Sequence, residues 1–154
     1  MSRSSRRGLL ISMALITGVF WGCGSQARPQ LPEERHLKAL VVLAGQYRGQ
    51  HQGKAPPSLE ALKAYVAKVD TNTLKRLDID PNQVESMFVS SRDKKPFVYR
   101  PATLGAPQMG PDGKPLQHVL FHEAEGSGGK RWVAYDLGGT ELVEESKFAQ
   151  LVPK

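Results

Sequence analysis

The sequence predicts an α+β domain in which the helices come first and an antiparallel sheet follows. Two observations support this class. Apolar residues recur at helical spacing between residues 32 and 77, and after Asp80-Pro81 the pattern changes to short apolar runs separated by polar or glycine-rich turns. Because helices grouped before strands are typical of α+β folds, we expect a long N-terminal helix packed on a small antiparallel β-sheet, with a short C-terminal helix at the end.

Three helices are predicted in the first half. The first begins at Pro32, a residue favoured in the first helical turn. Its apolar stripe consists of Leu37, Leu40, Val41, Ala44 and Tyr47. Ser58 is a good N-cap for a second helix that runs to about Val69, and Asp70 or Thr71 is expected to cap a third, short helical turn.

The second half is predicted to form the sheet. We expect paired strands at Met87–Ser90 and Phe97–Arg100 around a polar turn, followed by a long surface loop at 101–115 that is rich in proline and glycine. Three further strands are expected at 117–124, 131–136 and 140–143, before a terminal helix at 144–151. Strands that are neighbours in the sequence are expected to pair, across short turns or across this one long loop, so the sheet should be an antiparallel meander.

The N-terminus is typical of an export signal. Residues 1–7 hold three arginines and no acid, and residues 8–22 form an uncharged apolar run. This run is shorter than the roughly 20 residues of a transmembrane helix. Gly22 precedes Cys23, which is the only cysteine of the chain, so an intramolecular disulfide cannot form.

The Gly22-Cys23 junction resembles the lipobox of bacterial lipoproteins, although Phe20 and Trp21 are bulkier than the residues usual there. The resemblance implies a lipoprotein signal peptide at 1–22, acyl chains such as palmitate on Cys23, and a lipidated tether at 23–30. Gly24, in place of an aspartate, favours the outer membrane over the inner membrane, with the domain facing the periplasm. An ordinary cleaved signal with an incidental cysteine is the alternative, and the export route, Sec or twin-arginine, stays open.

Size and charge limit what the exported part can be. Without residues 1–22 the chain has 132 residues, enough for the single domain that we place at 31–154. The signal holds three of the 21 basic residues and none of the 15 acidic ones, which leaves a net charge of +3. The basic residues are spread along the chain without a cluster, so we expect no nucleic-acid partner.

Three segments resemble the soluble region of type II secretion pseudopilins and other pilin-like proteins. They are a helix–turn–helix stretch over Leu37–Tyr65, the turn Ser91-Arg92-Asp93 before Pro96-Phe97, and the final hairpin Arg131–Gly139. The resemblance implies a pilin-like domain working beside a secretion or pilus system. The prepilin leader and the polymerising apolar helix of that family have no counterpart among these residues, so a filament subunit of the usual kind is not expected.

Few residues qualify for a metal site. His118 and His122 lie four apart on a predicted strand, too far for one ion, and we expect them to face solvent beside Glu123. The Asp78–Asn82 stretch starts like a calcium loop, but Gln83 replaces the required glycine. Asp136 lies where some pseudopilins bind calcium, but it brings too few oxygen ligands. We therefore predict no metal ion and no cofactor.

The sequence favours a non-enzymatic, membrane-anchored interaction or accessory module over a catalyst. No serine has the surroundings of a nucleophile, and we assign no catalytic residue. Its predicted partners are the membrane, through the lipid, and a protein of the cell envelope. Two alternatives stay open. One is a small periplasmic hydrolase or metal-dependent enzyme with a site assembled from scattered residues, which clustering of His118, His122, Asp136 and Glu141 in one pocket would favour. A ligand-binding lipoprotein would use the 101–115 loop as a lid.

Overall fold

The structure is a computed structural model that describes residues 30–101, 109, 113 and 115–153. Three α-helices come first: α1 (Pro32–Gln50), α2 (Leu59–Val66) and α3 (Thr71–Arg76). They are followed by a 3₁₀ helix, η1 (Pro81–Phe88). The remaining elements are β1 (Val98–Tyr99), β2 (Val119–His122), β3 (Lys130–Tyr135), β4 (Thr140–Glu144) and the terminal helix α4 (Glu145–Leu151). The α+β class and the C-terminal helix are confirmed.

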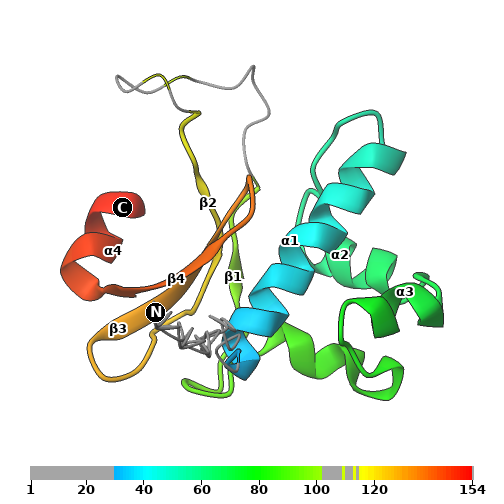
Figure 1. The fold of residues 1–154 in the computed structure, drawn as a ribbon, viewed down its shortest axis with the longest axis horizontal. Coiled ribbons are helices and arrows are strands. Elements are labelled where there is room, and N and C mark those ends of the chain that lie inside the picture. The colour runs from blue at the N-terminus through cyan, green and yellow to red at the C-terminus, as the bar shows by residue number, and fades with distance from the viewer. Residues whose placement is uncertain (1–29, 102–108, 110–112, 114, 154) are drawn as a thin grey trace, which may run out of the picture.

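The sheet has the strand order β1-β2-β3-β4, and every neighbouring pair is antiparallel. The predicted meander is therefore confirmed. Val98 of β1 pairs with His122 of β2, and His122 pairs in turn with Val133 of β3. Figure 1 shows helices on both faces of this sheet, with α1, α2 and α3 on one side and α4 on the other.

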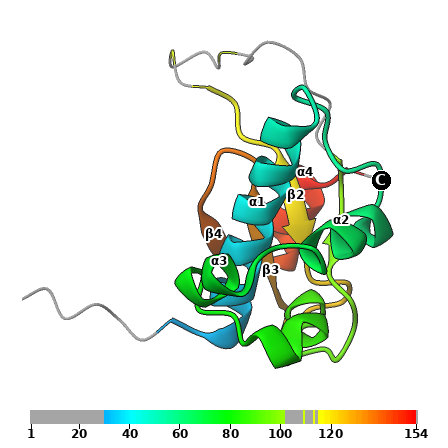
Figure 2. The same cartoon turned by 90° about the vertical axis from the view of Figure 1, so that its right-hand side faces the viewer.

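The main core fills the space between the sheet and the first helices. Trp132 and Ala134 point to this face because they alternate with Val133 along β3. Side chains from α1, α2 and the sheet bury one another there: Leu37, Leu40, Leu43, Leu62, Val66, Phe121 and Trp132. Figure 2, seen from the helical side, shows α1 running across the sheet with α2 and α3 beside it.

A second, smaller cluster lies on the opposite face of the sheet. It contains the buried valines Val119, Val133 and Val143. Phe148 and Leu151 of α4 pack against these valines, as the sequence predicted. Both faces of the sheet are therefore covered, at least in part, and this explains why every residue of β2 is buried.

Helix starts follow the local capping signals. The Ser58 hydroxyl accepts a hydrogen bond from the Ala61 amide at 3.1 Å, and the Asp70 carboxylate accepts one from Thr73 at 3.0 Å, so both predicted caps are confirmed. Helix α2 ends at Val66, three residues before the predicted end, because Ala67, Lys68 and Val69 continue only as turns.

The strand predicted at Met87–Ser90 is wrong. Asp80 and Pro81 start the first turn of η1, where the Asp80 carboxylate accepts a hydrogen bond from the Asn82 amide at 2.9 Å. Gln83 is non-helical, and a second helical turn after it ends at Phe88, so Met87 and Phe88 are helical and not extended. Only Val89 of this segment forms a bridge, to Pro96, flanked by hydrogen bonds from the Phe97 amide to the Phe88 carbonyl at 2.9 Å and from the Ser90 amide to the Lys95 carbonyl at 3.0 Å. The pairing goes no further because Met87 and Phe88 are helical. The partner of β1 is accordingly β2.

Two predicted features lie outside the described residues. These are the lipidation site at Cys23, with residues 1–29 around it, and most of the predicted 101–115 loop. Among the helices of the described ranges, none combines the length and the apolar character that crossing a membrane requires.

Candidate functional site

The four residues whose clustering in one pocket would favour an enzyme make their contacts in different places. His118 and Asp136 lie together, because the His118 amide donates to the Asp136 carboxylate at 3.0 Å and the Asp136 amide donates to the His118 carbonyl at 3.0 Å. Glu141 instead accepts hydrogen bonds from Tyr135 at 3.0 Å and from Lys147 at 2.5 Å. His122 lines a separate groove, described below.

The oxygen ligands considered for calcium have structural partners. The Asp136 carboxylate accepts a hydrogen bond from the His118 amide just before β2, and the Asp80 carboxylate caps η1. In the part of the chain that the structure describes, no three histidine, cysteine or acidic side chains lie close enough together to hold a metal ion.

The prediction that His122 faces solvent beside Glu123 is wrong. The exposed fraction of His122 is 6%, and Glu123 is fully buried. The pairing of β2 with β3 shifts register between Val119 and Phe121, so the simple alternation of inward and outward residues fails there. In addition, Phe148 of α4 lies edge-on against the His122 ring, with 4.9 Å between the ring centroids.

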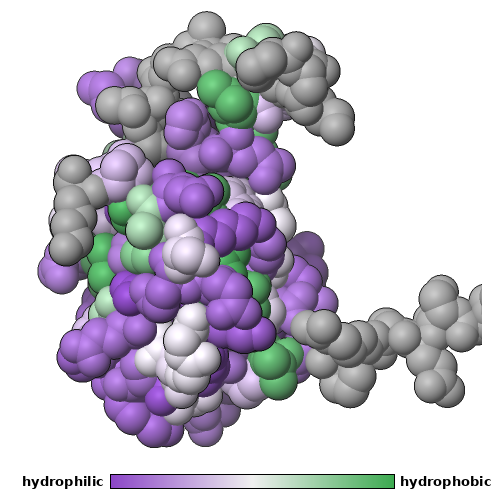
Figure 3. Space-filling model, turned by 90° about the vertical axis from the view of Figure 1, so that its left-hand side faces the viewer, coloured by the Kyte–Doolittle hydropathy of each residue, from purple (hydrophilic) through white to green (hydrophobic). Residues whose placement is uncertain are grey.

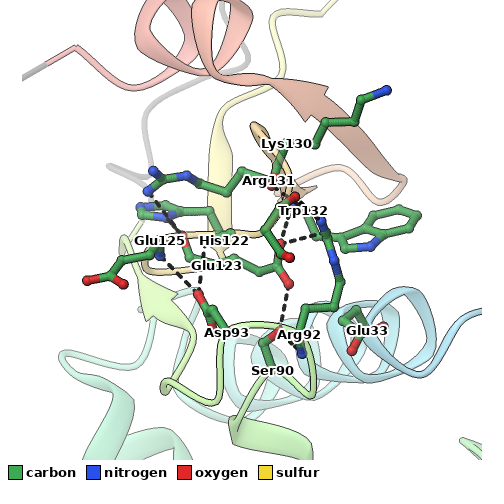
Figure 4. A network of polar contacts seen from close by, with 12 residues as sticks. Glu33, Ser90, Arg92, Asp93, His122, Glu123, Glu125, Lys130, Arg131 and Trp132 are labelled. Atoms are coloured by element: carbon green, nitrogen blue, oxygen red, sulfur yellow. Dashed lines mark hydrogen bonds and ion pairs between the residues drawn. The ribbon is translucent and has the colours of Figure 1, made fainter.

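Glu123 forms the centre of a buried polar network (Figure 4). Its carboxylate accepts hydrogen bonds from the Ser90 hydroxyl at 2.6 Å, from the Arg92 guanidinium at 2.9 Å and from the Trp132 amide at 2.9 Å. A buried charge is costly unless it is paired and hydrogen-bonded, and here one cation and two neutral donors satisfy it.

The same network joins the 90–95 loop to the turn between β2 and β3. Arg92 also donates to the Ser127 carbonyl at 2.6 Å. The Asp93 carboxylate accepts from the amides of Glu125 at 2.9 Å and Gly126 at 3.0 Å. Burial by itself would raise the pKa of Asp93, but these amides and that of Lys95 outweigh it and lower the pKa. The contacts hold two loops together, which is a structural role.

A groove of about 680 Å³, which we call the α4 groove, lies between α4 and the face of the sheet that carries Val98 and His122. Its apolar lining comes from β1, α4 and the residues after α4: Val98, Phe148, Ala149, Val152 and Pro153. Figure 3 shows the side of the molecule that bears α4, where hydrophobic residues form small areas within a largely hydrophilic surface. Three charged residues also line the groove: Arg100, Arg131 and Glu145.

Arg131 is fully engaged by the protein. Its guanidinium forms two hydrogen bonds of 3.0 Å with the Glu145 carboxylate and a third, of 2.5 Å, with the Ala124 carbonyl. It also lies 4.2 Å above the centroid of the Phe148 ring. The positive charge of Arg131 is thereby paired with Glu145, and the two residues fix the position of α4 against the sheet.

Arg100 and His122 are the polar groups of the groove that are left to act on a ligand. Among the described residues, the half-buried Arg100 side chain has no carboxylate or carbonyl partner. His122 donates through Nδ1 to the Glu123 carbonyl at 2.7 Å. The pKa of His122 is lowered, mainly by burial and further by the nearby guanidiniums of Arg131 and Arg100, although the hydrogen bond to Glu123 acts in the opposite direction. The ring is therefore neutral at pH 7, and Nε2 carries a lone pair that can accept a hydrogen bond.

A second hollow, of about 750 Å³, lies between α1 and α2. Tyr47 and His51 stack there with 3.8 Å between their ring centroids, and Tyr65 meets Tyr47 edge-on at 5.3 Å. The stacked faces of Tyr47 and His51 contact each other and are not open to a ligand, so we assign this aromatic cluster a structural role in holding the turn after α1.

Comparison with known proteins adds no further assignment, because the chain matches no protein-family model, no curated protein and no solved structure. The site is therefore defined by its own residues. Sequence reasoning missed the groove, although the alternation of Val98 and Arg100 around Tyr99 already indicates that these two share a face.

Proposed function

We propose that this protein is a lipid-anchored protein of the bacterial cell envelope, whose α+β domain acts through contacts with another protein. The observation that carries the proposal is the Gly22-Cys23 junction, which follows a basic head and an uncharged apolar run of signal-peptide length. Two or three acyl chains on one cysteine anchor a protein stably, whereas a single chain does not.

The position of the first helix limits where such a domain would act. Helix α1 begins at Pro32, nine residues after Cys23. Nine residues, fully extended, span at most about 30 Å. An anchored domain would therefore act close to the bilayer surface. The arrangement of a helix against an antiparallel meander is consistent with the pilin-like resemblance. We propose an accessory role beside a secretion or pilus-like system. The domain would face the periplasm, anchored in the outer membrane in preference to the inner membrane.

A binding role has a specific structural basis in the α4 groove, whose Arg100 and His122 have unused hydrogen-bonding capacity. This observation favours the contact-module hypothesis and, as a second candidate, a ligand-binding lipoprotein. The enzyme hypothesis has less support, because the Asp136 and Glu141 carboxylates have hydrogen-bond partners elsewhere and none of His118, Asp136 and Glu141 lines the groove with His122.

Metabolic labelling tests the anchor. Bacteria expressing the full chain are grown with a clickable fatty acid, and the wild type is compared with Cys23→Ala and with Ser25→Ala as a matched control. We expect label on the wild type and on Ser25→Ala, both in the membrane fraction, and no label on Cys23→Ala. An unlabelled wild-type protein would refute the anchor.

A further inference from the structure

The charges of the α4 groove leave one cation unmatched. Two guanidiniums, from Arg100 and Arg131, and one carboxylate, from Glu145, line it. Arg131 donates hydrogen bonds to both carboxylate oxygens of Glu145. Within the described ranges, Arg100 has no such partner, so the groove carries an excess of one positive charge. A ligand that complements this surface brings one anionic group to Arg100.

The groove also presents a hydrogen-bond acceptor. His122 is more than nine-tenths buried, and its Nδ1–H is already donated to the Glu123 carbonyl. Its Nε2 has no partner among the described residues, and since the ring is neutral this atom accepts and does not donate. A bare carboxylate would meet this lone pair unfavourably. The complementary ligand therefore carries an N–H or O–H donor beside its anionic group.

The remaining walls are apolar and close to these two polar groups. Val98 pairs directly with His122 across β1 and β2, and Phe148 contacts the His122 ring. Val152 adds a further apolar side chain. A volume of about 680 Å³ suits a group of a few residues and not a long segment.

We infer that the α4 groove binds the carboxyl terminus of a polypeptide that ends in an apolar residue. The terminal carboxylate binds Arg100, the amide N–H of the last residue donates to Nε2 of His122, and its side chain packs on Phe148 and Val152. A fatty acid offers the anion and the apolar chain but no donor. An internal apolar residue offers the donor but no anion. The C-terminal residue offers all three within a few ångströms.

This inference deepens the proposed function, since it rests on the domain acting through protein contacts and names the part of the partner that is recognised. It does not rest on the lipid. The two claims are therefore separable. Cys23→Ala should lose the fatty-acid label and keep peptide affinity, whereas Arg100→Gln should keep the label and lose peptide affinity.

The test uses the full chain in phospholipid nanodiscs and three fluorescein-labelled hexapeptides that end in Leu, Val or Phe with a free carboxylate. Binding is measured by fluorescence anisotropy, with empty nanodiscs as the blank. We expect saturable binding of at least one peptide, and an affinity lower by about tenfold or more when the same peptide ends in a carboxamide.

Variants assign the contacts. Arg100→Gln should weaken the free-acid peptide about tenfold and leave the carboxamide peptide nearly unchanged, whereas the matched control Arg76→Gln, on α3, should change neither. His122→Phe keeps the packing on Phe148 and should weaken both peptides by a similar factor. Circular dichroism confirms that each variant is folded.

Three results would overturn the inference. One is the absence of binding by all three peptides. Another is equal affinity for free-acid and carboxamide ends. The third is equal affinity of wild type and Arg100→Gln for the free-acid peptide. Laurate, added as a competitor, should displace the peptide poorly, and binding of laurate without binding of any peptide would assign the groove to fatty acids instead.

Discussion

Replacing Glu123 by glutamine tests whether the buried network stabilises the fold. The carboxylate is fully buried and accepts one hydrogen bond at Oε1, from Ser90, and two at Oε2, from Arg92 and Trp132. A glutamine oxygen can replace Oε2, while its amide group faces a Ser90 hydroxyl that already accepts from the Arg92 amide. The substitution therefore keeps most of the packing and removes the charge.

The size of the expected stability loss depends on how exposed Arg92, the ion-pair partner of Glu123, is to solvent. Removing one member of a fully buried ion pair costs about 3–5 kcal/mol. The Arg92 side chain is 21% exposed and keeps its bond to the Ser127 carbonyl, so water and that carbonyl compensate in part. We expect Glu123→Gln to lower the free energy of unfolding by about 2 kcal/mol and Glu123→Ala by about 4 kcal/mol.

Urea denaturation followed by circular dichroism measures both values. Glu125→Gln is the matched control, because Glu125 is the neighbouring acid and its ion pair with Lys95 is exposed, which predicts a loss below about 0.5 kcal/mol. If Glu123→Gln and Glu125→Gln lost the same small amount, the network would not carry the stability that its geometry indicates.

Two further predictions concern pH and the β2–β3 turn. Burial lowers the pKa of both His36 and His122 from 6.5, so the folded state disfavours their charged forms. The free energy of unfolding should be constant well above pH 6.5, where the histidines are neutral in both states, and should fall as the pH drops through 6.5 and below. Replacing both histidines by glutamine should flatten this slope in urea titrations at stepped pH. Gly126→Ala should lower the free energy of unfolding by at least about 2 kcal/mol, because φ is +71° and an added Cβ would clash with the Lys130 carbonyl oxygen. Gly128→Ala, at φ +62° with open space around it, should lower it by only about 1 kcal/mol. Thermal denaturation compares the two variants, and similar losses of stability would contradict this account.

The features that the sequence predicted correctly depend on neighbouring residues. Ser58 and Asp70 cap helices because a short polar side chain can reach an amide three residues later. The β3–β4 hairpin follows from two apolar runs around Gly138-Gly139, and the terminal helix from the spacing of Phe148 and Leu151. Local chemistry is sufficient for each of these elements.

The features that the sequence missed depend on contacts between distant segments. Met87 and Phe88 have the composition of a strand, but they lie in the second helical turn of η1 and their side chains are buried in the main core with those of α1. Likewise, nothing near His122 indicates its burial, which arises from a register shift and from α4 packing over it.

The α4 groove was missed for the same reason. Arg100 directly follows β1, His122 lies on β2 and Phe148 on α4, and only the folded sheet with α4 against it brings them together. The buried network likewise joins Ser90 and Arg92 to Glu123, which follows β2 more than thirty residues later.

The intact mass of the protein extracted from membranes tests the central claim most directly. If Cys23 carries the lipid, the mass should equal that of a chain beginning at Cys23 plus two or three acyl groups with a glyceryl link, and Cys23→Ala should yield no such species. A chain that begins at another residue without added mass, or one that still contains residues 1–22 in the membrane, would contradict the account.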